Sequence, residues 1–351
     1  MDIPFIHLVI LHCISKIKGE RSVSSIYHLL TGKKSSQTIQ DGMLFKIDSF
    51  FKTFPKLTRP FLDSIVNQLA ANGFIDVKED GIYELSPSGK RLLQERWGNY
   101  SFLSYLNGWK FQYADEFWKR LSLFVQVASH MKTQSAAYIP VQKEKEIQKW
   151  MKQFLFRQPY SKEKLSEQLY KELIHFFRKN KNVDPAVIVY RFSGKENIGL
   201  TDDQAARFLK REYTLYHYEF ISCLHFMMDY IGKNPAQFPL LKGTADGLVK
   251  EHPLTGSTKK TYELLQKGYS IEEISAMRNL KLNTIYDHIV ELAFYLDDFP
   301  IFPYVNDQLA TKIETAIAKS RSKQLKTIRQ YVPEAEYFQI RLVLAKNGGA
   351  Q

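Results

Sequence analysis

Hydrophobic residues recur at helical spacing from the start of the chain. Residues three or four positions apart lie on one face of a helix, so this run predicts a buried first helix that stops at Gly19. Further short helices are predicted over residues 23–30 and about 38–51, ended by Gly32 and Pro55. The apolar positions of the first helix are Ile6, Val9, Ile10, Cys13 and Ile17.

After a predicted helix over about residues 59–72, the hydrophobic period changes from helical to alternating. Residues 74–77 and 82–85 are strand-like and flank Asp80-Gly81, which is a strong β-hairpin signal. Helix, hairpin and a further helix is the order of a winged helix. We therefore predict a winged-helix-like domain over residues 1–96, with 59–72 as its recognition helix.

Residues 97–250 are predicted to form an aromatic-rich helical domain, including one long helix that starts at Thr201 and ends within 232–239. Lysine and glutamate are interleaved over residues 143–167, which is typical of a solvated, salt-bridged surface. Stacking of the aromatic side chains on nucleic-acid bases is the alternative, but aromatic residues at helical spacing are expected to form core. They include Trp97, Trp109, Phe111, Phe117, Trp118, Phe154, Phe156, Phe176 and Phe177.

Residues 251–351 carry the signals of a helix-turn-helix domain. Ser270 and Glu273 are spaced as a helix-capping box, and Asn279 suits the left-handed turn that ends such a helix. Asn283 is expected to cap the next helix, and a further helix is predicted over about 306–319. Two short helices and a tight turn describe a helix-turn-helix; the apolar stripe of the first is Ile271, Ile274 and Met277.

The start of the second helix faces base edges when such a unit reads DNA. Asp287 in the same turn would repel phosphate. The alternative is therefore that this unit only packs or binds protein. The predicted DNA-contacting side chains here are Asn283, Thr284, Tyr286 and His288.

Charge supports a polyanionic partner. The chain has a formal net charge of +12, and a basic excess favours nucleic acid or an anionic surface. From residue 312 to 346, eight basic residues stand against three acidic ones; a solvated helix face is the alternative to phosphate binding. The predicted phosphate contacts are Lys319, Arg321, Lys323, Lys326 and Arg329, together with Lys78 on the predicted wing.

Other classes of function lack their motifs. Thr31 to Ser35 only superficially resembles a phosphate-binding loop, because the first glycine and the final Ser/Thr are missing. Cys13 and Cys223 are too few and too distant for a disulfide framework or zinc site, and indicate reduced core residues of a cytoplasmic protein. No catalytic site, cofactor or metal is expected. The apolar start is too short to span a bilayer and lacks a basic leader, so no membrane partner is expected.

The segment from Thr255 to Lys346 resembles the helix-turn-helix domain at the C-terminus of many bacterial RecQ-type DNA helicases. The order and spacing of four short pieces carry this resemblance. They are residues 261–265, 270–275, 282–289 and 340–345.

The whole chain is also similar to the YpbB family of Gram-positive bacteria, through residues 19–22, 25–30 and 32–42. Members of that family are typically encoded beside a short RecQ-type helicase that lacks the C-terminal domain. The resemblance implies an accessory subunit that supplies this domain and leaves ATP hydrolysis to the helicase.

Together these patterns predict a mainly α protein with three domains, over residues 1–96, 97–250 and 251–351. The leading interpretation is a non-catalytic DNA-binding partner of a RecQ-type helicase in DNA repair or recombination, favouring forked or single-stranded DNA. The alternatives are a helix-turn-helix transcription regulator, which needs a dimer and a sequence preference, and a protein-interaction scaffold without direct DNA binding.

Overall fold

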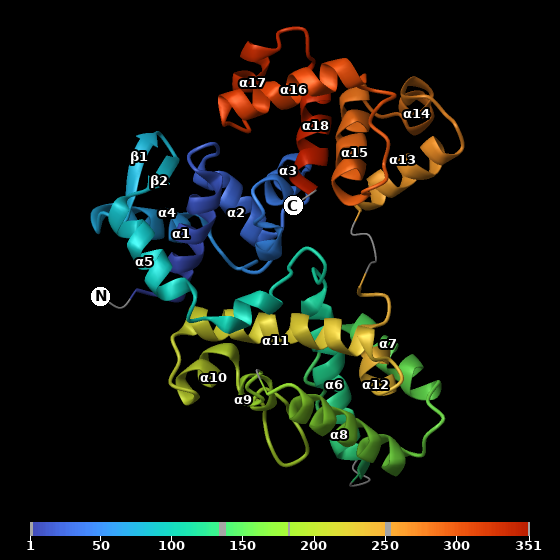
Figure 1. Ribbon diagram of the computed structural model, residues 1–351. Helices are drawn as coiled ribbons and strands as arrows, with labels where there is room; N and C mark the ends of the chain where they lie inside the picture. The colour runs from blue at the N-terminus through green and yellow to red at the C-terminus, as the bar shows by residue number, and fades with distance from the viewer. Residues whose placement is uncertain (1–2, 133–137, 182, 250–253, 350–351) are drawn as a thin grey trace. The chain divides into compact units, whose positions relative to one another are not determined.

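The computed structural model confirms a mainly helical chain with one small β-hairpin (Figure 1). By its internal contacts the chain divides into two compact units, each assembled from separate segments. Unit 1 comprises residues 1–9 and 94–250, and unit 2 comprises residues 10–93 and 251–351. The three-domain division stays a prediction. The structure describes residues 3–132, 138–181, 183–249 and 254–349.

The N-terminal part of unit 2 is a group of short helices followed by the hairpin. The predicted helix over 38–51 is wrong in its extent: α3 ends at Leu44, and Lys46 takes a left-handed φ of 53° before a separate 3-10 turn. The elements are α1 (Phe5–Ile17, whose first residues belong to unit 1), α2 (Val23–Thr31), α3 (Ser36–Leu44), η1 (Asp48–Phe50), α4 (Arg59–Ala71), β1 (Ile75–Glu79), β2 (Ile82–Leu85) and α5 (Pro87–Trp97).

The predicted hairpin and its flanking helices are confirmed. β1 and β2 pair antiparallel, with Ile75 opposite Leu85, and Gly81 supplies the positive φ of the turn at 72°. The register shifts between Val77 and Glu79, so Lys78 lies at an irregularity of the strand. Thr58 caps α4, accepting the N–H of Phe61.

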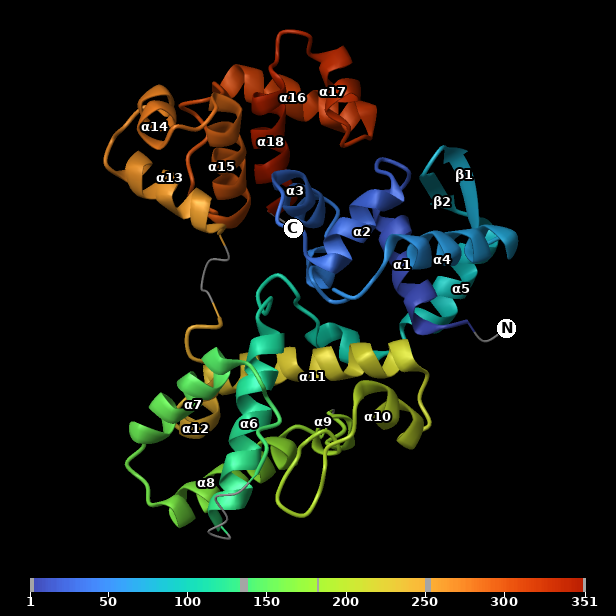
Figure 2. The same cartoon turned by 180° about the vertical axis from the view of Figure 1, so that it is seen from behind.

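The C-terminal part of unit 2 packs around α15, which contacts α3, α13, α14 and α18. The buried residues of α15 include Ile285, Ile289 and Leu292, and they form the centre of the domain. Figure 2 shows the same arrangement from behind. The helices are α13 (Gly256–Gln266), α14 (Ile271–Arg278), α15 (Leu282–Tyr295), α16 (Asp307–Ser320), α17 (Leu325–Tyr331) and α18 (Tyr337–Gly349).

Unit 1 packs its helices around α11, whose Tyr216 is fully buried and donates its hydroxyl to the carbonyl of Val187 at 2.8 Å. The long helix predicted from Thr201 is wrong: it is broken at Lys210, where φ is 53°. The elements are η2 (Ser101–Tyr105), α6 (Ala114–Lys132), α7 (Lys145–Phe156), α8 (Lys162–Lys179), α9 (Ala186–Val189), α10 (Asp202–Phe208), α11 (Tyr213–Lys233) and α12 (Pro239–Ala245).

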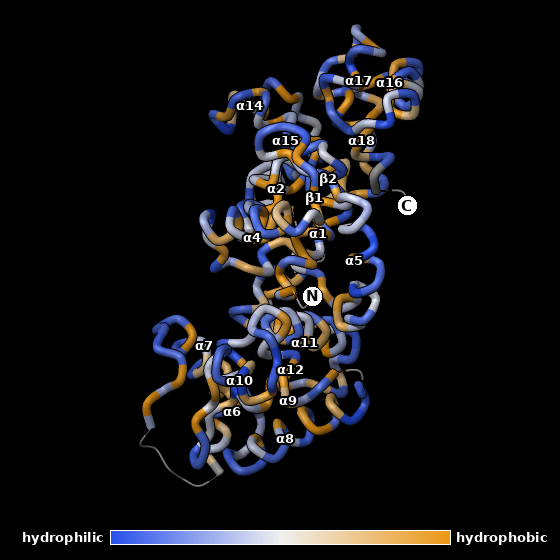
Figure 3. The backbone as a smooth tube through the Cα atoms, turned by 90° about the vertical axis from the view of Figure 1, so that its left-hand side faces the viewer, coloured by the Kyte–Doolittle hydropathy of each residue, from blue (hydrophilic) through white to orange (hydrophobic). Residues whose placement is uncertain are grey.

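Hydropathy differs sharply between helices. α1 is largely hydrophobic and α5 largely hydrophilic along their lengths (Figure 3). Nevertheless, no helix among the described residues is both long and apolar enough to cross a membrane.

Candidate nucleic-acid interface

The helix-turn-helix is built by α14 and α15 around a tightly bonded turn. The capping box is confirmed: Ser270 Oγ accepts the N–H of Glu273 at 3.2 Å, and Glu273 Oε2 accepts the N–H of Ser270 at 2.8 Å. Asn279 ends α14 in the predicted left-handed conformation, with φ 50° and ψ 48°. Ser275 Oγ donates to the carbonyl of Leu280 at 2.6 Å. These bonds fix the direction in which α15 leaves the turn.

Only the first turn of α15 is open to a ligand. The helix begins two residues earlier than predicted, because the carbonyl of Lys281 already accepts the N–H of Thr284 at 2.8 Å. Lys281 is therefore the N-cap, and the prediction that Asn283 caps the helix is wrong. The Asn283 side chain is exposed and Thr284 is half-buried, so both remain available for a polar contact.

Beyond that turn, α15 is mostly buried, although Tyr286 and Asp287 are half-buried. Ile285 and all residues from His288 to Phe294 are buried, because α3, α13, α14 and α18 contact this helix. A helix that reads DNA lies along the major groove with a free face. Since no residue of α15 beyond Asn283 is exposed, deep groove reading by this helix is not supported.

His288 and Tyr286 are engaged inside the domain. His288 is 6% exposed, and its Nδ1 lies 2.8 Å from the hydroxyl of Thr261. Burial, reinforced by the nearby Arg278 charge and opposed by Asp287, lowers the pKa of His288 to about 4. Tyr286 stacks on Phe338 with ring centroids 4.2 Å apart. Neither ring is free for the base contacts predicted from the sequence.

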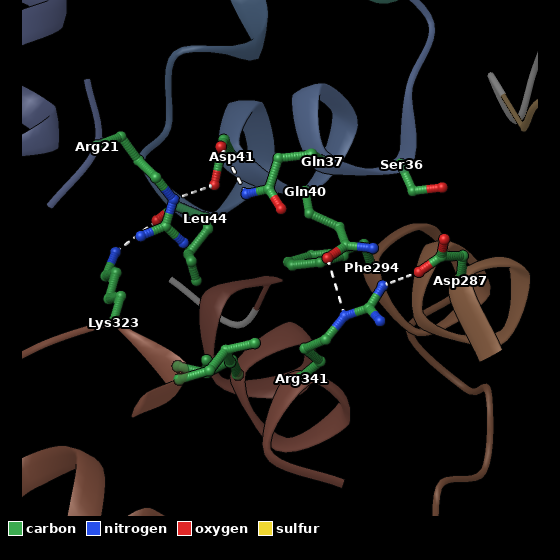
Figure 4. Close-up of a pocket in the computed structure, with 12 residues that line it drawn as sticks. Arg21, Ser36, Gln37, Gln40, Asp41, Leu44, Asp287, Phe294, Lys323 and Arg341 are labelled. Atoms are coloured by element: carbon green, nitrogen blue, oxygen red, sulfur yellow. Dashed lines mark hydrogen bonds and ion pairs between the residues drawn. The ribbon is translucent and has the colours of Figure 1, made fainter. Parts of the chain in front are cut away.

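Lys323 and Arg341 point into a cavity of about 230 Å³ between α3, α15 and α18 (Figure 4). Arg341 pairs with Asp287, and its Nε donates to Gln40 Oε1 at 3.1 Å. Lys323 Nζ donates to the carbonyl of Leu44. These cations therefore join α3 to the helix-turn-helix domain, and Asp287, predicted to repel phosphate, is partly neutralised.

Sequence reasoning missed the α3 side of this cavity. Asp41 is buried and accepts from Arg21 Nε at 2.9 Å; burial raises the pKa of Asp41, and the Arg21 charge opposes that rise. Gln40 and Asp41 stood within the segment that carried only the family resemblance. In the sequence they are only two adjacent polar residues on a short helix, and this does not reveal that Gln40 bonds to Arg341, 301 positions away.

The exposed cations of the C-terminal part gather around the α16–α17 connection. Lys319, Arg321, Lys326 and Arg329 are all exposed, and the guanidinium of Arg329 lies 4.9 Å from the centre of the Tyr337 ring. We call these four residues the basic edge. Among the described residues, Lys319, Arg321 and Lys326 have no ion-pair partner within 4.0 Å. Their charges are therefore available to an external anion.

A groove of about 350 Å³ adjoins the basic edge between α16 and α17. Lys319 and Tyr331 both line it, and the Tyr331 ring is 54% exposed. Lys312 also lines the groove but pairs with Glu334 at 2.9 Å. The groove thus combines an unpaired cation with an accessible aromatic ring.

The predicted wing and its recognition helix carry little free charge. Lys78 pairs with Glu84 at 2.6 Å across the hairpin. On α4, Arg59 pairs with Asp63 at 2.8 Å and also donates to Ser24 Oγ at 2.7 Å. Backbone binding to DNA depends on unneutralised Lys and Arg, so this surface is a weaker candidate than the basic edge.

No metal centre is indicated in the described part of the chain. No group of three or more His, Cys, Asp or Glu side chains there is placed to hold a metal ion. Cys13 and Cys223 are both buried as free thiols, and burial raises the pKa of each thiol to about 12. Neither cysteine is therefore an accessible thiolate.

The α14–α15 geometry defines a helix-turn-helix domain, and many domains of this class bind DNA. A family model described as a helix-turn-helix domain matches residues 257–344. Along its whole length the chain resembles Protein YpbB of Bacillus subtilis (strain 168), with 32% identity over 349 residues, 99% of this chain and 98% of that protein. This chain belongs to the YpbB family. No solved structure matches it.

Proposed function

We propose that this protein is a non-catalytic DNA-binding partner of a RecQ-type helicase, and that it binds DNA phosphates through the basic edge. The observation that carries the proposal is a contrast within unit 2. Lys319, Arg321 and Lys326 are exposed without ion-pair partners among the described residues, whereas α15 is buried beyond its first turn. Charge for backbone binding is therefore available, whereas α15 offers little exposed face for reading base sequence.

This contrast favours forked or single-stranded DNA over a duplex operator. Unpaired bases stack on exposed aromatic rings, while phosphates bind neighbouring cations. Tyr331 and Lys319 line the same groove and supply that combination. A transcription regulator requires side chains that reach base edges, and on α15 Asn283 is the one exposed polar residue.

The test is DNA binding by a variant that loses three charges while keeping the fold. Arg321 ends α16 with a left-handed φ of 50°, where alanine would be strained but glycine is not. The variant is therefore Lys319→Ala/Arg321→Gly/Lys326→Ala, with Lys323 left in place because it bonds to Leu44. In fluorescence anisotropy on labelled single-stranded DNA, we expect about tenfold weaker binding and a salt slope smaller by about 2, since each phosphate contact contributes about 0.7.

The matched control removes three exposed lysines from other surfaces of unit 2, namely Lys56, Lys90 and Lys259. Forked, single-stranded and duplex DNA are compared for each protein. Equal losses of DNA affinity in the control and the test variant would show that the basic edge is not the DNA-binding site. Binding confined to one duplex sequence would instead favour a regulator.

A separate surface of the helix-turn-helix is suited to the helicase. Met277 is 57% exposed and Leu282 is also exposed, one on each side of the turn; the prediction that Met277 belongs to the buried stripe is wrong. Exposed apolar side chains clustered on a surface mark protein-binding sites. With the resemblance to the helicase C-terminal domain, this supports docking through the turn.

Docking is tested by pull-down with a purified RecQ-type helicase that lacks the C-terminal domain. Met277→Ser/Leu282→Ser is expected to weaken capture about tenfold or more, as loss of a buried interface anchor does, and to leave DNA affinity unchanged. The control is Phe61→Ser/Val77→Ser, which alters two exposed apolar residues elsewhere in unit 2. Full capture by the first variant would exclude the turn as the docking surface.

A further inference from the structure

Helix α7 of unit 1 presents a continuous cationic stripe that ends in an exposed aromatic ring. Lys145, Lys149 and Lys152 are exposed, and the Phe156 side chain is 92% exposed. Successive spacings of four, three and four residues place these four positions within about 60° of one another around the helix. They therefore form one surface, which we call the α7 stripe.

The opposite face holds α7 in the core of unit 1. Ile147, Met151 and Phe154 are buried, and the Phe154 ring packs edge-on against Phe124 with centroids 5.2 Å apart. Figures 1 and 2 show α7 beside α6, which it contacts. Phe156 lies outside this packing, so the prediction that it belongs to the aromatic core is wrong.

The lysines of the α7 stripe are not neutralised by the described residues. None of the three has an ion-pair partner there within 4.0 Å, and the nearby Glu144 is occupied by Lys119 at 2.5 Å. Arg157 and Lys162 are exposed just beyond the helix and extend the positive surface.

We propose that the α7 stripe is a second binding site, specific for single-stranded nucleic acid. The lysines bind successive phosphates and the Phe156 ring stacks on an unpaired base, the combination that non-sequence-specific single-strand binders use. The apolar face of α7 is buried in unit 1, so the helix offers a membrane one ring and no apolar stripe. The site lies in unit 1 and does not depend on the basic edge of unit 2.

The test uses the full chain in the Lys319→Ala/Arg321→Gly/Lys326→Ala background, so that the basic edge contributes little. The probe is fluorescein-labelled oligo(dT) of about 15 nucleotides, within the usual site size for such surfaces. Phe156→Ala is expected to weaken binding about tenfold through loss of stacking. Lys145→Ala/Lys149→Ala/Lys152→Ala is expected to reduce the salt slope by about 2.

Two control variants match these changes elsewhere in unit 1. Tyr170→Ala removes another exposed aromatic ring, and Lys179→Ala/Lys181→Ala/Lys195→Ala removes three other exposed lysines. Both are expected to bind like the background protein.

Equal losses in the controls, an equal effect of Phe156→Ala on duplex DNA, or no residual oligo(dT) binding by the background protein would each overturn the proposal. The proposal would also be overturned if the Phe156 and lysine variants kept their oligo(dT) affinity and lost binding only to anionic phospholipid vesicles. Failure of the basic edge appears instead as unchanged binding when Lys319, Arg321 and Lys326 are replaced, so the two proposals fail separately.

Discussion

Acidification from pH 7 to pH 4 is expected to destabilise unit 2 by about 3 kcal/mol through His288 alone. Burial is the main reason why the folded protein resists protonation of this ring, and the charge of Arg278 adds to it. Arg278 donates to the Thr261 hydroxyl, which lies 2.8 Å from His288 Nδ1. A protonated ring would therefore place a second cation beside Arg278.

The direction follows from the two pKa values. The pKa of His288 is about 4 in the folded protein, against an ordinary value of 6.5. Below pH 6.5 the unfolded chain takes up a proton that the folded chain refuses, so the stabilising contribution is complete above pH 6.5 and is lost as the pH falls to 4. Burial raises the pKa of the neighbouring Glu291, which changes stability in the opposite direction over acidic pH.

The effect of His288 is isolated by comparison with His288→Asn. The side-chain amide of asparagine can bond to the Thr261 hydroxyl in place of Nδ1, and it does not titrate. Urea unfolding of both proteins at pH 7 and pH 4.5 is the measurement, and the wild type should lose about 2 to 3 kcal/mol more than the variant between these values. Equal losses would show that the ring is protonated in the folded protein.

Gly89→Ala is expected to destabilise unit 2 by about 3 kcal/mol, at the upper end of the cost of overpacking. A Cβ on Gly89 would overlap the carbonyl oxygen of Phe74 and lie 2.9 Å from its carbonyl carbon. Both atoms are backbone, so no side-chain rotation relieves the clash. Ser86 Oγ also binds the carbonyl of Gly73 at 2.6 Å and fixes the start of α5 against the hairpin.

Gly98→Ala is the matched control, because Gly98 follows α5 directly and a Cβ there meets nothing within 4 Å. Its effect on stability is expected to stay within about 0.5 kcal/mol, as for other surface changes. Thermal unfolding followed by circular dichroism compares the two variants. A Gly89→Ala protein as stable as the control would mean that α5 is not held against Phe74.

Because α15 is largely buried, the helix-turn-helix of this protein serves mainly to pack unit 2. The same helix that begins beside the turn is the centre of packing for α3, α13, α14 and α18. Arg341 and Gln40 link α18 to α3 at its side. The motif therefore organises unit 2, and the charges proposed to bind DNA lie on α16 and α17.

Several local features were predicted correctly because residues a few positions apart determine them. The capping box of Ser270 and Glu273, the left-handed Asn279 and the Asp80-Gly81 hairpin each depend on short-range hydrogen bonding or on the conformations that those residues allow. Helical periodicity likewise located most helices, although it missed the breaks at Lys46 and Lys210, where lysine takes a positive φ. Lysine gives no sequence signal for that conformation.

The sequence by itself determined the mainly helical class, the helix-turn-helix, the hairpin and the excess of positive charge. Only the tertiary structure decided which polar side chains bond inside the protein and which are exposed to solvent. His288 is buried and bonds to Thr261, 27 positions away. Arg341 bonds to Gln40, 301 positions away. Phe156 lies outside the core of unit 1. Burial depends on packing between distant segments, and the periodicity of a single helix carries no information about that packing.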